Sequence, residues 1–173
     1  MGYRSNIVLA CAFPTEQQVV GYIARQRLVD TEGIWNEHLK NNLKVWTSPL
    51  DPKEGITCVV AFVKIDDVKW YSEFKDVKAL KKFFWESEKC GGAWIELAVG
   101  EDNATSTEAG YDGEVVEADH CYAELREYFY THAYISTPHD NGGKSPLVKP
   151  INDFIKEAKQ NEEVRQQGVD NAT

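Results

Sequence analysis

The most reactive side chains lie together in the second half of the chain, where Asp119, His120 and Cys121 are consecutive and His132 follows. A thiol beside an imidazole is the pair used by nucleophilic cysteines, and the same donors can ligate zinc. Both chemistries need a base or further ligands within reach in three dimensions, which adjacency in the sequence does not provide. An ordinary surface position on the polar face of a strand explains His132 as well as a catalytic or metal-binding role does. We therefore assign no catalytic residue and no metal ligand from the sequence.

A second chemical candidate is the run Gly142-Gly143-Lys144-Ser145, which resembles the end of a phosphate-binding P-loop. A P-loop needs a glycine five residues before Gly143, where this chain has Pro138, and a helix starting at the Lys-Ser pair. Pro146 follows at once, and no apolar strand leads into the loop. The sequence thus predicts no nucleotide site and no cofactor.

The strongest signal is electrostatic. Between residues 90 and 125 there is no lysine or arginine, but there are nine acidic residues: Glu96, Glu101, Asp102, Glu108, Asp112, Glu114, Glu117, Asp119 and Glu124. The remaining 19 acids balance the 19 bases, so this segment carries the whole net charge of −9. Such a field repels nucleic acid and anionic membranes, and it attracts cations or basic protein surfaces.

The acidic segment admits three interpretations. A solvated loop is the simplest. Glu101, Asp102, Asn103, Glu108 and Asp112 offer oxygen ligands for calcium or magnesium, but their spacing does not match an EF-hand. Carboxylates can also imitate phosphates and compete for the basic groove of a nucleic-acid-binding protein.

Hydrophobic patterning predicts the elements that position these residues. We expect strands at 7–13, 43–47, 56–65, 93–99 and 125–136, helices at 15–28, 76–89 and 150–167, and a further helical stretch at 30–39. Asp76 is the expected cap of its helix, and Gly91 the left-handed residue after it. Residues 103–114 are expected to form a loop, and 115–122 have no clear preference.

This order predicts an α+β fold of the ferredoxin-like type, in which a split βαβ arrangement forms an antiparallel sheet. Two helices would cover one face, and the other face would be open or covered by the C-terminal helix. The expected core domain spans 1–136, followed by a linker at 137–150 and a C-terminal helix with a disordered tail at 151–173.

Alternation in the strand expected at 125–136 would place Tyr128, Tyr130 and Tyr134 on one side. Tyrosines are frequent anchors of protein interfaces. This side would face either a partner or the C-terminal helix.

Two observations bear on the compartment. The four cysteines, Cys11, Cys58, Cys90 and Cys121, are widely spaced without a CxxC pair, as in reduced intracellular proteins. The apolar run at 7–13 is too short to span a membrane. We expect a cytoplasmic protein.

Three segments together resemble a family. The opening MGYRS, the segment Asp67-Val68-Lys69-Trp70-Tyr71 and the strand end Val99-Gly100-Glu101-Asp102 occur here in that order. This order resembles small proteins of unassigned function encoded by bacteriophages and prophages, over residues 1–136. The resemblance implies a phage accessory protein acting in the cytoplasm of a bacterial host. It carries no assigned catalytic residues, and the long acidic insertion after Asp102 departs from its pattern.

Our first functional hypothesis is a non-enzymatic acidic protein that binds a basic surface of a host protein and inhibits or modulates it. Nucleic-acid mimicry in an anti-defence or takeover role is one form of this hypothesis. We expect no direct contact with nucleic acid or membrane. The expected partner-binding residues are Glu101, Asp102, Glu108, Asp112, Glu114, Glu117, Tyr128, Tyr130 and Tyr134.

Two alternatives belong to other classes. The chain could be a small-molecule binder or an enzyme, with a pocket that joins Arg4, Lys69, Trp70 and Glu101. It could also be a self-assembling structural phage component, a homo-oligomer in which the tyrosine-bearing strand is the self-interface.

Overall fold

The computed structural model describes residues 3–51, 53, 56–102, 104–130 and 148–170. In chain order its elements are β1 (Ser5–Phe13), α1 (Glu16–Leu28), the short π-helix η1 (Trp35–Leu39), β2 (Lys44–Asp51), β3 (Ile56–Val68), α2 (Lys75–Trp85), the 3-10 turn η2 (Glu86–Lys89), β4 (Ala93–Gly100), β5 (Thr105–Tyr111), α3 (Val116–Tyr130), β6 (Lys149–Pro150) and α4 (Ile151–Asp170).

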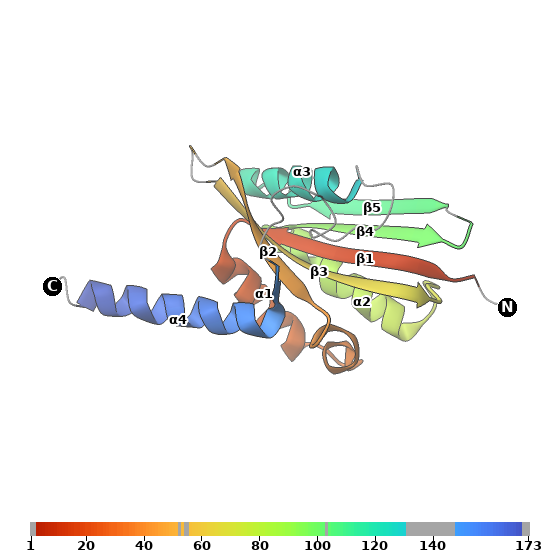
Figure 1. Ribbon diagram of the computed structural model, residues 1–173, viewed down its shortest axis with the longest axis horizontal. Coiled ribbons are helices and arrows are strands. Elements are labelled where there is room, and N and C mark those ends of the chain that lie inside the picture. The colour runs from red at the N-terminus through yellow and green to blue at the C-terminus, as the bar shows by residue number, and fades with distance from the viewer. Residues whose placement is uncertain (1–2, 52, 54–55, 103, 131–147, 171–173) are drawn as a thin grey trace.

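The strands form one six-stranded sheet in the order β5-β4-β1-β3-β2-β6, and every neighbouring pair is antiparallel (Figure 1). Helices pack on both faces of this sheet, and the C-terminal helix α4 extends well beyond it (Figure 1). The predicted α+β class with an antiparallel sheet and a C-terminal helix is therefore confirmed.

The two faces of the sheet bury two separate cores. On one face, alternate residues of β1 from Ile7 to Phe13 pack with side chains of α1, α2, η1 and the start of α4. On the other face, Val8, Ala10 and Ala12 of the same strand pack with α3. Burial on both faces explains why the central strands β1 and β3 are apolar at almost every position rather than alternating.

The expectation that the second face is open or covered by the C-terminal helix is wrong, because α3 covers it. The strand expected at 125–136 is also wrong over 125–130, which is helical, and 131–136 lies outside the described residues. The buried residues Ala118, Cys121, Leu125 and Phe129 are spaced by three or four positions, as on one helical face. The residues from Leu125 onward fit both the two-residue alternation of a strand and the second half of this helical pattern. The prediction of a strand rested on the two-residue alternation, whereas the structure has the helix.

The segment expected as a loop at 103–114 contains β5. Its seven residues, TSTEAGY, are half-exposed to exposed because β5 lies at the edge of the sheet. A strand that buries so little apolar surface gives a weak hydrophobic signal, which explains why the sequence pattern missed it.

Helix ends follow local chemistry with one exception. Thr15 and Gln18 form a reciprocal capping box at the start of α1, and Gly91 adopts the left-handed conformation (φ 79°) after η2, as predicted. The predicted cap at Asp76 is wrong, since Phe74 occupies the N-cap and Asp76 lies in the first turn of α2.

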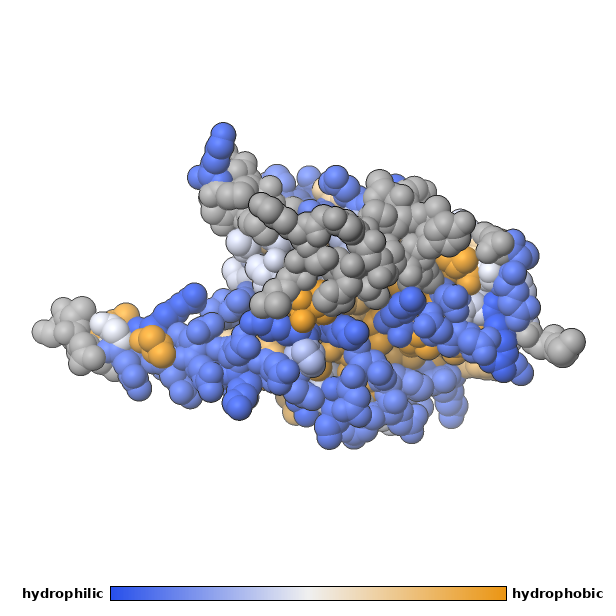
Figure 2. All heavy atoms as spheres, in the orientation of Figure 1, coloured by the Kyte–Doolittle hydropathy of each residue, from blue (hydrophilic) through white to orange (hydrophobic). Residues whose placement is uncertain are grey.

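The C-terminal helix docks through its first turns only. Ile151 and Phe154 are buried against the core that contains α1, whereas residues 159–169 are exposed. The protruding part of α4 is hydrophilic along most of its length (Figure 2). Most of the expected linker lies outside the described residues, and its end forms β6, which pairs with β2.

Candidate functional site

The free edge of the sheet at β5 carries most of the acidic segment. Among the described residues, β5 pairs only with β4 and has no neighbour on its outer side. An edge strand presents unpaired backbone N–H and C=O groups along its outer side. We call this strand, with the turns at its two ends and the first turn of α3, the acidic edge; it comprises residues 101–102, 104–114 and 116–119.

The first end of the acidic edge is the turn between β4 and β5. The Tyr3 hydroxyl donates a hydrogen bond to Asp102 Oδ1, and the backbone N–H of Arg4 donates to Glu101 Oε1 over 3.1 Å. The hydrogen bond from Tyr3, with a second from the Ala104 amide, lowers the pKa of Asp102, and the same contact raises the pKa of Tyr3. Both carboxylates are exposed and remain available to a partner.

The second end of the acidic edge is the connection from β5 to α3. Asp112 Oδ1 accepts the backbone N–H of Glu114 over 3.1 Å, which shapes the turn. Glu117 and Asp119 lie in the first turn of α3, where the positive end of the helix dipole stabilises carboxylates. With Glu108 at the middle of β5, the carboxylates extend along the whole strand, a length of about 20 Å.

Glu96 does not belong to this exposed field, although it lies in the same stretch of sequence. It is 95% buried on the face covered by α2, where Lys81 Nζ lies 3.1 Å from Glu96 Oε1 and the Trp70 indole donates to the same oxygen over 2.8 Å. Lys81 also lies over the rings of Trp70 and Trp85, at 5.9 and 5.5 Å from their centroids. Glu96, counted in the sequence among the acids that provide the negative field, is therefore neutralised by a buried partner instead.

A hydrogen bond between Trp94 and Glu88 supports the edge strand β5 from beneath. The Trp94 indole donates to Glu88 Oε2 over 2.8 Å, and both groups lie against Gly110 of β5. A Cβ at Gly110 would lie 2.3 Å from the Glu88 oxygen and 2.7 Å from the indole nitrogen. Glycine is therefore required at this position for β5 to lie where it does.

Of the expected tyrosine row, Tyr128 does not join the acidic edge. Tyr128 is half-buried on α3, and its ring packs 5.0 Å from that of Trp46 in β2, three strands away from β4 and four from β5. Tyr130 is the last residue of α3, and Tyr134 lies outside the described residues. Because 125–130 is helical, Tyr128 and Tyr130 do not share one strand face.

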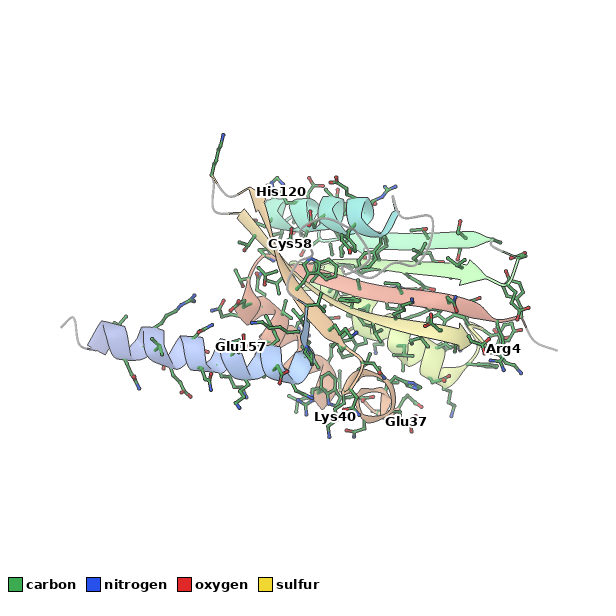
Figure 3. The ribbon with its side chains drawn as sticks, in the orientation of Figure 1. Arg4, Glu37, Lys40, Cys58, His120 and Glu157 are labelled. Atoms are coloured by element: carbon green, nitrogen blue, oxygen red, sulfur yellow. The ribbon has the colours of Figure 1, made fainter. Side chains whose placement is uncertain are left out.

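The expected pocket forms only in part. Arg4 and Glu101 line a hollow of about 220 Å³ at the end of the sheet, but Lys69 and Trp70 do not line it. Arg4 Nη1 donates to the backbone oxygen of Asp67 over 2.6 Å and to its carboxylate over 3.0 Å. Tyr3 and Arg4 thus contact both the Asp67 segment and the Gly-Glu-Asp strand end at one corner of the fold, where Figure 3 labels Arg4.

The reactive trio at 119–121 does not assemble a nucleophile or a metal centre. Cys121 is fully buried against Cys58, His120 is exposed on α3, and His132 lies outside the described residues (Figure 3). Within the described part of the chain, no group of three or more His, Cys, Asp or Glu could hold a metal ion. The P-loop-like run at 142–145 lies outside it.

Sequence reasoning missed the buried pair of Lys81 and Glu96, with Lys81 over the rings of Trp70 and Trp85. The available signal was the acid at position 96 inside an otherwise apolar strand, because a carboxylate there must find a buried partner.

Comparisons of this chain with family models, with curated proteins and with solved structures give no match. No helix of the described chain combines the length and apolar character that a membrane crossing requires.

Proposed function

We propose that this chain is a non-catalytic acidic binding protein whose acidic edge docks onto a basic surface of a host protein and modulates it. The observation that carries the proposal is the set of exposed carboxylates in the turns at the two ends of β5, with Glu108 between them, on a strand that has no outer neighbour among the described residues. Edge strands offer backbone hydrogen bonds to a partner, and the flanking carboxylates favour partners rich in lysine and arginine. The resemblance to phage proteins supports a role inside a bacterial host, including anti-defence action.

Rigid support of the edge strengthens this proposal. The Tyr3 and Arg4 contacts hold one end, the Asp112 turn holds the other, and the Trp94–Glu88 pair packs beneath Gly110. A charged surface that is already ordered loses little conformational entropy when a partner binds. Mimicry of nucleic acid is the specific form in which the carboxylates occupy the phosphate sites of a basic groove.

The test compares two variants of equal charge change. The edge variant replaces Glu101, Glu108, Glu114 and Glu117 by Gln, and the control variant replaces Glu37, Glu73, Glu162 and Glu163, all exposed elsewhere, by Gln. Tagged wild-type protein is used to capture partners from bacterial lysate at low and moderate salt. Each captured protein is then purified, and its Kd is measured with all three chains.

We expect to capture a basic partner whose affinity for the chain falls as the salt concentration rises. The edge variant should bind this partner at least about tenfold more weakly than the wild type, and the control variant should bind it equally tightly. If nucleic acid competes with the chain for that partner, the mimicry form is supported. A partner that binds the edge variant as tightly as the wild type contradicts the proposal.

We also infer that the core has the ferredoxin-like topology. The element order β1-α1-β2-β3-α2-β4 and the strand order β4-β1-β3-β2 inside the sheet support this assignment. On this view β5 and α3 are additions that widen the sheet and cover its second face.

A further inference from the structure

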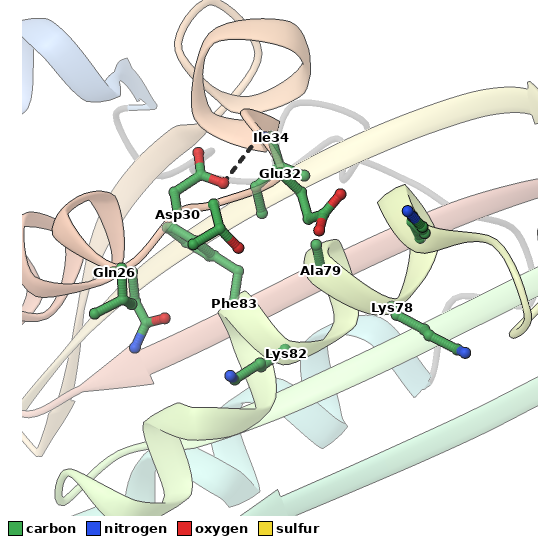
Figure 4. A pocket seen from close by; sticks show the side chains of 11 residues that line it. Gln26, Asp30, Glu32, Ile34, Lys78, Ala79, Lys82 and Phe83 are labelled. Atoms are coloured by element: carbon green, nitrogen blue, oxygen red, sulfur yellow. Dashed lines mark hydrogen bonds between the residues drawn. The ribbon is translucent and has the colours of Figure 1, made fainter.

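We propose that the cavity between α1 and α2 binds a small aromatic anion, a flat apolar body that carries a phosphate or a carboxylate. The cavity has a volume of about 290 Å³ and contains no residue of β5 or α3, so this proposal does not depend on the acidic edge. Its walls are the end of α1, the turn at 30–34 and one side of α2 (Figure 4).

The floor of the cavity is apolar. Val29 and Ile34 contribute from the α1 side, and Ala79 and Phe83 contribute from α2. Phe83 and Ile34 belong to the buried core, so this part of the floor is fixed, whereas Val29 is exposed at its rim. A flat apolar body placed there would remove these side chains from water, which favours binding.

The α2 wall is basic. Lys75, Lys78 and Lys82 line the cavity at spacings of three and four residues, which places them on one side of the helix. Lys82 lies 3.9 Å from Glu86, whereas no carboxylate among the described residues pairs with Lys75 or Lys78. In a chain with a net charge of −9, these two ammonium groups are available to an anionic ligand.

The opposite wall supplies polar groups that orient a ligand. Both carboxylate oxygens of Asp30 are occupied by the backbone N–H groups of Ile34 and Trp35, at 3.1 and 2.9 Å, so Asp30 shapes the wall (Figure 4). Glu32 is exposed on the same side and disfavours an anion there, so a ligand's negative group would lie toward α2.

A buried amide with only one long hydrogen bond also lines the cavity. Gln26 is 95% buried and lines the cavity. Its Nε2 donates a long hydrogen bond of 3.5 Å to Glu86 Oε2, at the limit of ordinary hydrogen-bond length. A buried amide normally has better partners, and a ligand hydroxyl or amide would provide one.

The experiment records amide chemical shifts of the ¹⁵N-labelled full chain during titration with phenyl phosphate and, separately, with benzoate. Inorganic phosphate tests the anionic group without the ring, and benzylamine tests the ring with the opposite charge. We expect saturable shifts confined to residues 26–34 and 75–83 with one or both aromatic anions. The anion that binds more tightly, phenyl phosphate or benzoate, shows whether the site prefers a phosphate or a carboxylate. Inorganic phosphate should bind at least about tenfold more weakly, and benzylamine should leave these residues unshifted.

Variants locate the site. K75Q/K78Q should weaken binding at least about tenfold, because each lysine provides a charge-assisted contact. The matched control K156Q/K159Q, at exposed positions of α4, should leave the affinity unchanged. A79F fills the cavity without changing charge, and should abolish the shifts while the protein keeps its native circular dichroism.

Three outcomes would overturn the proposal. The first is that neither aromatic anion shifts the amide signals of residues 26–34 and 75–83 at millimolar concentration. The second is that inorganic phosphate binds as tightly as the aromatic anions. The third is that K75Q/K78Q and A79F bind the aromatic anions as tightly as the wild type.

Discussion

Removal of Lys81 should destabilise the protein strongly, because it leaves the Glu96 carboxylate buried without its countercharge. The two side chains are only 15% and 7% exposed, and their charged atoms lie 3.1 Å apart. At an effective dielectric constant of about 20, this separation corresponds to an attraction of about 5 kcal/mol. Desolvation of both groups offsets part of it, so the pair as a whole contributes much less.

The expected cost of K81M is about 3 kcal/mol in the free energy of unfolding, as for other buried pairs that lose one partner. Methionine keeps the apolar contacts with Trp70 and Trp85, so the cost reports mainly the lost charge. In the background of E96Q, whose amide oxygen can still accept from the Trp70 indole, K81M should cost less than about 1 kcal/mol. The coupling free energy is then about 2 kcal/mol.

The assay is urea unfolding followed by far-ultraviolet circular dichroism, since tryptophan fluorescence would change with the substitutions themselves. Equal m-values for the four chains would show that the unfolding transitions are comparable. The control is K82M on the same helix. Its pair with Glu86 is longer, at 3.9 Å, and 67% and 30% exposed, so it should cost less than about 0.5 kcal/mol. A K81M cost no larger than that of K82M would refute the reasoning.

Four further predictions test the edge and the core. G110A should lower the free energy of unfolding by about 2 kcal/mol, because its Cβ meets the Trp94–Glu88 pair. The control G113A should cost little, because no atom lies near its Cβ. Equal urea midpoints for the two variants would contradict this prediction. Y3F should raise the pKa of Asp102 toward its ordinary value, measured by carboxyl NMR titration, and an unchanged titration would exclude the hydrogen bond as its cause. In native protein Cys90 should react with a thiol reagent well before the three buried cysteines, and equal reaction rates would count against their burial. Burial raises the pKa of the Cys11 thiol, and a hydrogen bond with Cys121 together with burial raises the pKa of the Cys58 thiol, so the unfolded chain releases these protons first. These two thiols should therefore leave the free energy of unfolding unchanged between pH 6 and 8, and above about pH 9 each should lower it by about 1.4 kcal/mol per pH unit. A flat alkaline limb would contradict this.

The sequence by itself determined the elements whose signals are local or strong. The largely apolar runs of β1, β3 and β4 identified the central strands, and the capping residues of α1 and Gly91 after η2 identified helix ends. The charge segregation was also readable, because it needs only residue counts. It predicted an acidic surface, and the exposed carboxylates of the acidic edge match that prediction.

Only the tertiary structure decided which residues share a site. The pattern beginning at Leu125 fits two periods, and the covering of the second sheet face selects the helical one. The acid at position 96 looks like its acidic neighbours in sequence, but strand alternation turns it under α2 to Lys81. The cavity between α1 and α2 joins residues about fifty positions apart, whose contact depends on the crossing of two helices over one sheet. Such long-range contacts arise from packing, and no local pattern encodes them.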